Sequence, residues 1–142
     1  MASNADLARM REEAEAARTF EHHVAIQVDV LEAGHAVLYL DIQPFHLNSN
    51  GTLHGGVYAT LIDNAMGMAV AALVGVRIAT TQMNVHFLGQ VKEGRVVCRG
   101  HLVHRTRRTA TAEAKVYDAA GNLVGMGTGA FRIFEQQGHP IV

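Results

Sequence analysis

The chain has 142 residues, of which 49% are apolar and 18% are charged, a composition typical of one folded domain with a substantial core. Its 12 Lys and Arg residues nearly balance its 13 Asp and Glu residues, which gives a net charge of −1. Because nucleic-acid-binding domains usually carry a basic excess, this balance argues against a nucleic acid partner. We therefore expect a single domain over residues 1–142, with residues 1–20 as an N-terminal helical extension.

Three features bear on the cellular compartment. The single cysteine, Cys98, has no second cysteine to pair with, so nothing in the sequence requires an oxidising compartment. The longest unbroken apolar stretch, Ala65–Val76, is shorter than the about 20 residues that span a bilayer. The N-terminus also lacks the basic-then-apolar pattern of a signal peptide. We therefore expect a cytoplasmic protein without a membrane partner.

The first third of the chain changes from a helical to an extended pattern. Residues 4–18 are rich in Ala, Glu and Arg and predict a short surface helix, with Asn4 or Asp6 as its cap. Its thin apolar stripe consists of Leu7, Met10, Ala14 and Ala17. Residues 24–42 then alternate with a period of two and turn at residues 32–34, which predicts a β-hairpin.

A polar loop over residues 43–53 leads into a long helix over residues 55–74. That helix contains no proline, and Gly75 follows it as a stop signal. It is apolar nearly all round, which is the pattern of a helix enclosed in a core, and Asp63 is its only charged residue.

The segments after this helix alternate and are rich in β-branched residues. The predicted strands span Ile78–Leu88, Gly94–Val103, Thr109–Tyr117 and Leu123–Phe134. This order favours the α+β class, with an antiparallel sheet of about six strands wrapped round the apolar helix. Gly125, Gly127 and Gly129 share one face of the last strand, so we expect another backbone to approach closely there. The edge strands of such a sheet commonly pair with a second copy of the chain.

Asp63 and the start of its helix are the candidate chemical groups. A buried carboxylate is costly unless it is bonded, so Asp63 is either a structural residue satisfied by Thr60 or Asn64, or a general base or nucleophile. At residues 54–56, His-Gly-Gly, the helix begins with unpaired N–H groups and no side chains on the two glycines. That arrangement suits an oxyanion hole, and the alternative is a tight turn into the helix.

The spacing of these groups predicts a site shared between two chains. Gly55 and Asp63 are eight residues apart in sequence. This separates them by about 12 Å along a helix that rises 1.5 Å per residue. A substrate carbonyl bound at Gly55 is then out of reach of Asp63 in the same chain. If both groups act on one substrate, Asp63 must come from a second chain, as in a two-fold dimer.

The sequence from Asn48 to Asn64, NSNGTLHGGVYATLIDN, resembles that of the hot-dog-fold acyl-CoA thioesterases of the phenylacetic acid degradation (PaaI-type) family. The shared pattern is an Asn, then G-x-x-H-G-G, then an Asp nine residues after the His. The match continues through TTQMNVHFL from Thr80 and LVGMGTG from Leu123. The resemblance covers roughly residues 20–134. It implies a hot-dog fold that hydrolyses an acyl-CoA thioester, with aromatic acyl groups slightly favoured.

The same resemblance implies roles for individual residues. Asp63 would be the catalytic carboxylate, Gly55 would supply the oxyanion N–H, and Thr80 would help to place the attacking water. Asn48 and His54 would shape the site. The substrate-binding residues implied by the matching segments are Gly56, His86 and Phe87. The family uses no metal and no cofactor beyond the coenzyme A of its substrate, and its dimers commonly pair into tetramers. Whether Asp63 acts as general base or as nucleophile stays open.

Arg105, Arg107 and Arg108 cluster at a predicted hairpin turn. Because coenzyme A carries phosphates, we predict that this cluster binds them, and an ordinary solvated turn is an equal alternative. Lys92 and Arg95 are a weaker candidate for the same role.

Two other functions stay open at this point: a hot-dog hydratase or dehydratase acting on acyl thioesters, and a non-catalytic acyl-CoA-binding module. The histidines show no metal-binding spacing, and Cys98 fits a small buried residue. Met66 and Met68 fit either the core or the lining of an acyl pocket.

Overall fold

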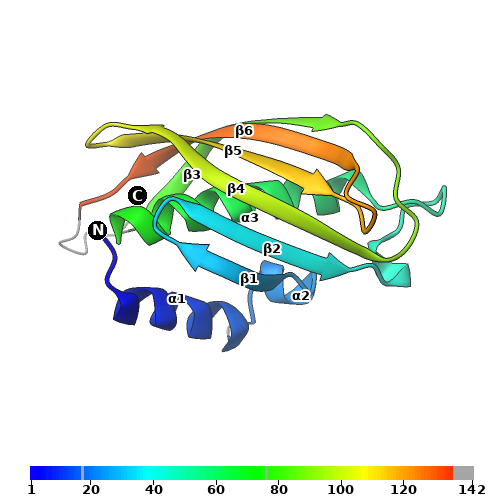
Figure 1. Cartoon of the computed structure of the whole chain (residues 1–142), viewed down its shortest axis with the longest axis horizontal. Coiled ribbons are helices and arrows are strands. Elements are labelled where there is room, and N and C mark those ends of the chain that lie inside the picture. Colours follow the sequence, from blue (N-terminus) through cyan, green and yellow to red (C-terminus); the bar gives the residue numbers. More distant parts are fainter. Residues whose placement is uncertain (17, 76, 136–142) are drawn as a thin grey trace.

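The computed structural model describes residues 1–16, 18–75 and 77–135 (Figure 1). Its helices are α1 (Asn4–Ala16), α2 (Phe20–His23) and α3 (Gly55–Val74), with a 3-10 turn at Pro44–His46. Its strands are β1 (Gln27–Glu32), β2 (His35–Asp41), β3 (Ile78–Phe87), β4 (Arg95–Arg105), β5 (Thr109–Tyr117) and β6 (Leu123–Ile133).

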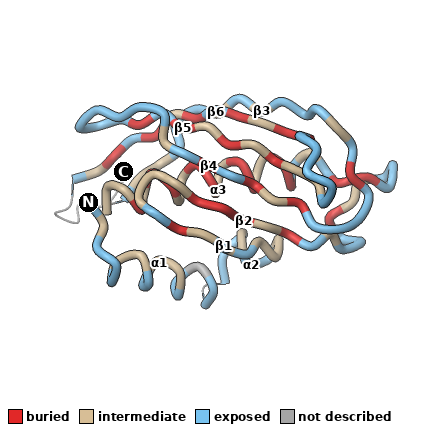
Figure 2. The backbone as a smooth tube through the Cα atoms, viewed as in Figure 1, coloured by how far each residue is buried: buried red, intermediate tan, exposed pale blue. Residues whose placement is uncertain are grey.

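The six strands form one antiparallel sheet in the order β1-β2-β4-β5-β6-β3. The sheet curves around α3, as Figure 1 shows. Buried residues lie along α3 and on the strands that face it, drawn in red in Figure 2. The predicted sheet wrapped round one central helix is therefore confirmed, and β1 and β3 are its two edges.

The sheet covers α3 on one side rather than all round. Leu61, Ile62 and Val70 are fully buried, whereas Thr60 and Asp63 on the other side of the helix are partly exposed. By length and composition alone α3 could cross a membrane, but half of its apolar window is buried inside this chain. It is the core helix of the fold, with one side left for another surface to cover.

The three glycines of β6 make room for the helix. A Cβ at any of them would lie only 2.6–2.8 Å from a neighbouring atom. The α3 side chains that occupy this space are Tyr58 at Gly125, Ile62 at Gly127 and Met66 at Gly129. The two series match because four helical residues rise about 6 Å and two strand residues rise about 6.7 Å. The expected close approach of another backbone is found at Gly127, where a Cβ would lie 2.6 Å from Asn84 O. At all three glycines, large side chains of α3 also occupy the space.

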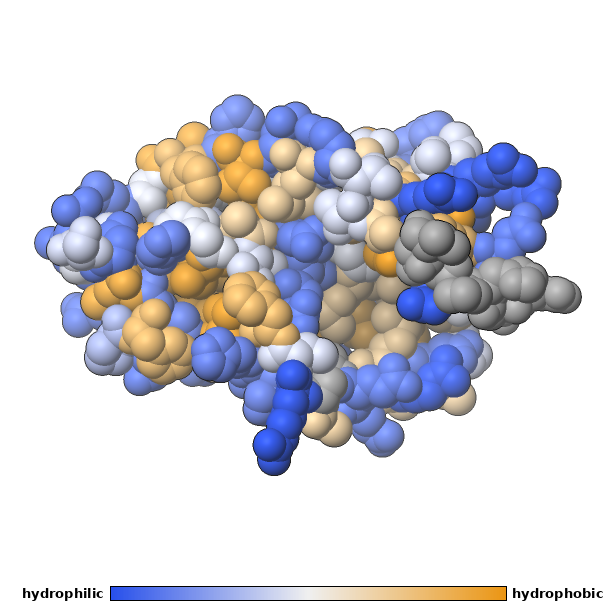
Figure 3. Space-filling model, turned by 180° about the vertical axis from the view of Figure 1, so that it is seen from behind, coloured by the Kyte–Doolittle hydropathy of each residue, from blue (hydrophilic) through white to orange (hydrophobic). Residues whose placement is uncertain are grey.

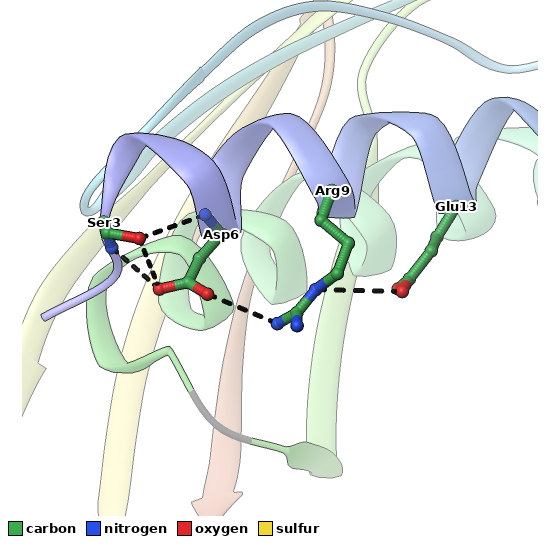
Figure 4. Close-up of polar contacts among 4 residues, drawn as sticks. All are labelled: Ser3, Asp6, Arg9 and Glu13. Carbon is green, nitrogen blue, oxygen red and sulfur yellow. Dashed lines mark hydrogen bonds and ion pairs between the residues drawn. The ribbon is translucent and has the colours of Figure 1, made fainter.

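Ser3 caps the N-terminus of α1, and the Asp6 side chain bonds back to the Ser3 backbone (Figure 4). Ser3 Oγ accepts the Asp6 N–H at 3.1 Å, and Asp6 Oδ2 accepts the Ser3 N–H at 2.9 Å. These bonds hold the pKa of the Asp6 carboxyl below its ordinary value. Arg9 lies between Asp6 and Glu13, at 3.3 Å and 3.8 Å from their carboxylates. Ser3 is therefore the N-cap, so the predicted cap at Asn4 or Asp6 is wrong, although Asp6 completes the capping box.

The segment between α1 and β1 departs from the predicted strand. Thr19 caps the short helix α2, whose C-cap is Val24 in a helical conformation. Ala25 then adopts a left-handed conformation with φ of 65°, so β1 begins at Gln27 instead of Val24. At the other end of the predicted helix 4–18, Ala17 lies outside the described residues.

Candidate active site

The ring of His54 caps the start of α3. His54 Nδ1 accepts the Gly56 N–H at 2.8 Å, and His54 O accepts the Val57 N–H at 2.9 Å. Within the described part of the chain, no acceptor lies within hydrogen-bond distance of the Gly55 N–H. Of these three first-turn amides, the Gly55 N–H is the one left to bind a substrate oxygen.

The two glycines are needed for different reasons. A Cβ at Gly56 would lie 3.0 Å from His54 Nδ1, so a side chain there would disturb the cap. A Cβ at Gly55 would lie 3.2 Å from a ring carbon of Phe87, which places that ring beside the open amide. Gly56, predicted to bind substrate, has its own N–H occupied by the cap. The structure therefore offers one oxyanion donor at this helix start rather than two.

Asp63 is bonded to β3 and not to its own helix. Its Oδ1 accepts a hydrogen bond of 2.7 Å from Thr80 Oγ1, and no donor to its Oδ2 is found among the described residues. The two structural partners that the sequence offered are engaged elsewhere. Thr60 Oγ1 donates to Gly56 O at 2.7 Å, and the Asn64 side chain donates to Thr60 O at 2.8 Å. A partly exposed carboxylate with one oxygen held and one available is a suitable proton acceptor.

A β-bulge turns Thr80 toward Asp63. The pairing of β3 with β6 shifts by one residue between Thr80 and Gln82, and Thr81 Oγ1 donates to Ala130 O at 3.1 Å inside the shift. Side chains alternate across a strand, so without the shift Thr80 would face away from α3. The sequence predicted an uninterrupted alternation over residues 78–88, so the bulge and the role of Thr81 were missed. The only local sign of this bulge in the sequence was the pair of adjacent threonines near the start of the strand.

The distance argument for a shared site holds in the folded chain. Gly55 and Asp63 belong to one uninterrupted helix of 20 residues. Their separation of about 12 Å along the axis follows from the helical rise. The carboxylate and the open amide of one chain therefore do not meet at one carbonyl.

Asn48 is engaged within its own loop. Its Oδ1 accepts the N–H groups of Asn50 at 2.9 Å and Thr52 at 3.2 Å, and its Nδ2 donates to Thr52 Oγ1 at 3.0 Å. These bonds shape the loop that leads to His54. Its predicted catalytic role stays a prediction, because no described bond joins it to Asp63.

Phe87 and His86 occupy opposite faces of β3. The Phe87 ring packs edge-on against Tyr58 with centroids 5.7 Å apart, beside Gly55. Tyr58 donates to Gly89 O at 2.8 Å, and burial raises the pKa of its phenol. Phe87 thus lies beside the start of α3, and its predicted substrate-binding role stays a prediction. His86, one position earlier, lies on the outer face of the sheet, away from Asp63 of its own chain.

The predicted arginines surround a pocket of about 530 Å³ at the far end of α3, lined also by Val74 and Glu135. Its basic residues are Arg105, Arg107, Arg108 and Arg132. Glu135 takes up part of the charge, since its carboxylate lies 2.9 Å from Arg107 Nη2. Arg105 ends β4 and is not part of the turn. Sequence reasoning missed Arg132, because only strand pairing places β6 next to Thr109 of β5.

Three lesser candidates take no part in this arrangement. Arg95 is paired in two places with Asp41, at 2.7 Å and 3.0 Å, which lowers the pKa of that carboxyl. Cys98 is fully buried, and burial raises the pKa of its thiol. Within residues 1–16, 18–75 and 77–135, no three His, Cys, Asp or Glu side chains gather as metal ligands.

Known proteins share this fold. Phenylacetic acid degradation protein PaaI of Thermus thermophilus superimposes with a TM-score of 0.76 at 28% identity, over 81% of this chain and 98% of that one. Zebrafish thioesterase superfamily member 2 superimposes with a TM-score of 0.82, over 90% of this chain and 98% of that one. At 23% identity, that second likeness shows the fold alone. The hot-dog architecture expected from the sequence is thereby confirmed.

Sequence comparison points to the same family. Human acyl-coenzyme A thioesterase 13 is 29% identical over 116 residues, which is 78% of this chain and 82% of that protein. The profile of the Thioesterase superfamily matches residues 50–124, a span that contains Gly55, Asp63 and Thr80. This confirms the predicted enzyme class, a thioester hydrolase. The chain belongs to the Thioesterase superfamily.

Proposed function

We propose that the protein hydrolyses an acyl-CoA thioester to the free acid and coenzyme A, with Asp63 as general base and the Gly55 N–H as oxyanion donor. The observation that carries this proposal is the hydrogen bond of 2.7 Å from Thr80 to Asp63 Oδ1. It fixes the carboxylate, and the second oxygen stays available to a water molecule. The acyl groups best suited are aryl-acetyl, hydroxybenzoyl-like or medium-chain groups.

The reaction follows from the chemistry of these groups. Asp63 Oδ2 accepts a proton from water as the water oxygen attacks the thioester carbonyl carbon. The carbonyl oxygen becomes an oxyanion and accepts the Gly55 N–H. The C–S bond then breaks, and coenzyme A leaves as a thiolate that takes up a proton. Direct attack by Asp63, through a mixed anhydride that water later opens, is the alternative course.

Each site takes Gly55 from one chain and Asp63 from another. A homodimer paired through the open β3 edge would bring the start of one α3 toward Asp63 of its partner, in two equivalent sites. Hydrophobic residues gather at the end of the molecule where α3 begins (Figure 3). Phe87, which ends β3 there, and Leu88, which follows it, are 59% and 53% exposed. A second copy would cover such a surface, and two dimers would then form a tetramer.

The arginine pocket is the proposed binding site of the coenzyme A phosphates. Among the described residues, its lining has four arginines and one glutamate, and Arg107 is paired with that glutamate. Phosphate oxygens are strong acceptors for guanidinium groups. The hydratase alternative gains no support from His54, because its ring is engaged as a helix cap.

The experiment is an assay of thiol release from phenylacetyl-CoA, 4-hydroxybenzoyl-CoA and octanoyl-CoA. Asp63→Asn should lower kcat by about 10²–10⁴-fold, because the amide keeps the shape but accepts no proton from water. Asp41→Asn is the matched control, since Asp41 is an exposed carboxylate bonded to Arg95. Activity of Asp63→Asn near wild type would remove Asp63 from catalysis. A collapsed thermal melt would instead make it a structural residue.

A further inference from the structure

Both ring nitrogens of His46 are bonded inside the protein. The residue ends the 3-10 turn Pro44–His46 and is only 2% exposed. Its Nδ1 accepts the Gln43 N–H at 2.8 Å. Its Nε2 lies 2.6 Å from Val24 O, which can only accept, so Nε2 carries the ring hydrogen and donates the bond. The ring therefore keeps one tautomer and joins the segment before β1 to the segment after β2.

The backbone of the same residue leads to the start of α3. His46 O accepts the His54 N–H at 2.9 Å, which closes the loop of residues 46–54 at its base. The His54 ring in turn accepts the Gly56 N–H at 2.8 Å, next to the Gly55 N–H. The position of the Gly55 amide thus depends on where His54 lies, and His54 is bonded to His46.

Val24 gives this arrangement a fixed end. Its own N–H donates to Phe20 O at 2.9 Å, and its side chain packs against the main core. The next residue, Ala25, has φ of 65° and donates its N–H to His22 O at 3.0 Å. These bonds hold the Val24 carbonyl in one direction, so the His46 ring has a rigid acceptor. Contacts therefore run without a break from α2 to the residue that caps α3.

We propose that His46 is a positioning residue for the oxyanion donor, and that it acts through its hydrogen bond to Val24 O. This inference rests on the proposed hydrolysis, in which the Gly55 N–H binds the oxyanion. The His46 ring holds the loop of residues 46–54, whose last residue sets the start of α3. Hydrogen bonds weaken when their distance and angle depart from the optimum, so a displaced Gly55 N–H stabilises the transition state less. The segment before β1 thereby supports the active site from outside it.

Two amide variants separate the two bonds of the ring. The Asn side chain reaches about as far as Nδ1, so His46→Asn keeps an acceptor for the Gln43 N–H and loses the bond to Val24 O. The longer Gln side chain reaches about as far as Nε2, so His46→Gln keeps a donor for Val24 O.

Thiol release by His46→Asn should show a kcat lower by about 10–10²-fold, which is less than the about 10²–10³-fold expected when an oxyanion donor is lost outright. KM should change by less than about 2-fold, because the oxyanion forms only in the transition state. His46→Gln should keep most of the activity.

Amide hydrogen exchange tests the same claim without catalysis. Labelling with 15N-glycine restricts the spectrum to the 14 glycines, which include Gly55 and Gly56. When the loop is held less firmly, the His54 ring caps Gly56 for less of the time. The Gly56 N–H of His46→Asn should therefore exchange at least about 10-fold faster than that of wild type. In His46→Gln it should exchange at nearly the wild-type rate.

Two further variants separate positioning from stability. Val70→Ala truncates a fully buried side chain about 22 Å from Gly55 along α3, so it should lower the melting temperature but leave kcat and Gly56 exchange unchanged. Ala25→Pro breaks the bond from the other side, because Val24 is helical, with φ of −75° and ψ of −9°, and a residue before proline avoids that region. It leaves His46 intact and should reproduce both effects of His46→Asn, so the inference stays testable even if His46→Asn does not fold.

Unchanged kcat and unchanged Gly56 exchange in the folded His46→Asn or Ala25→Pro protein would overturn the inference. A loss of activity in His46→Gln as large as in His46→Asn would also overturn it, since the bond to Val24 O would then not be the cause. Losses that Val70→Ala reproduces at the same melting temperature would make His46 a structural residue. If Gly56 exchange follows the prediction but wild-type protein releases no thiol, the proposed hydrolysis fails, whereas the positioning of the helix start by His46 stands.

Discussion

The two edges of the sheet are treated in opposite ways. At the β1 edge the chain covers its own backbone, since α1 packs alongside and Arg11 donates to Val28 O at 3.0 Å and Asp29 O at 3.3 Å. At the β3 edge no described segment lies in the next position of the sheet, although β3 is ten residues long. An open edge of this length invites pairing with another chain unless it is protected.

The difference between the edges coincides with the chemistry. Thr80 and Asp63 meet at the open β3 edge, and the described residues at the covered β1 edge include no comparable pair. The site at β3 also lacks an oxyanion donor within reach, because Gly55 lies about 12 Å along the helix. A second chain at this edge would satisfy both needs at once, by pairing with the strand and supplying the amide.

The largest expected effect comes from blocking the β3 edge. Gln82→Lys with Asn84→Lys places like charges opposite each other across a β3–β3 pair, which opposes pairing. We expect the mass in sedimentation to fall to that of one chain, 15.3 kDa. We expect kcat/KM to fall by about 10²-fold or more, because each site loses its oxyanion donor.

The control for this variant is Glu32→Lys on β1, which changes the net charge by the same two units at the covered edge. It should retain the wild-type mass in sedimentation and wild-type activity. If the β3 variant also remains an active dimer, the interface lies elsewhere.

The next largest effect is expected from two variants of Thr80 that distinguish the role of its hydroxyl from that of its size. Thr80→Val keeps the shape but removes the hydrogen bond to Asp63, so kcat should fall by about 10-fold. Thr80→Ser keeps the hydroxyl and should retain most of the activity. Steady-state kinetics and a thermal melt of both variants check this. Equal activity of the Val and Ser variants would show that the bond does not matter.

A smaller, selective effect is expected at the other end of the substrate. Arg107→Ala with Arg108→Ala should raise KM for acyl-CoA by several-fold, and the effect should shrink at high salt. KM for the matching pantetheine thioester, which lacks the nucleotide phosphates, should hardly change. Similar effects on both substrates would return these arginines to an ordinary solvated turn.

The smallest effect is expected at the covered β1 edge, where Arg11 bonds to the backbone of β1. Arg11→Met keeps the aliphatic contacts of the side chain but removes its donors to Val28 O and Asp29 O. We expect a loss of about 1 kcal/mol in the free energy of unfolding, measured in urea, with the dimer unchanged. A gain of higher oligomers would show that Arg11 also protects β1 from pairing.

Much of the fold follows from local patterns, and the rest depends on partners far along the chain. Alternation and turn residues predicted β5 with its observed bounds, and Gly75 predicted the end of α3. The bulge at Thr81 was not predictable in this way, because it exists only through pairing with Ala130 of β6. The place of Arg132 in the arginine pocket was not predictable for the same reason, because it depends on the pairing of β6 with β5.

The candidate site shows the same division. Asp63, Gly55 and Thr80 were identified from their motif, and the structure brings Asp63 and Thr80 together. The sequence could not show that His54 occupies the Gly56 N–H, since residue spacing does not fix a ring orientation.

Subunit complementation tests the shared site most directly. Asp63→Asn removes the base, and Gly55→Pro removes the oxyanion N–H at a position that accepts proline. His54 has φ of −63° and ψ of 137°, which suits a residue before proline, and proline is favoured at the first helical position. Gly55→Ala is the control, because it keeps the N–H while meeting Phe87 in the same way.

The two inactive variants are mixed, and subunit exchange is followed by native mass spectrometry. Each mixed dimer should hold one site with both defects and one intact site, so activity should return to about half of wild type per mixed dimer. If the chains exchange, both variants are folded and no activity returns, then Asp63 acts within its own chain and the shared site is contradicted.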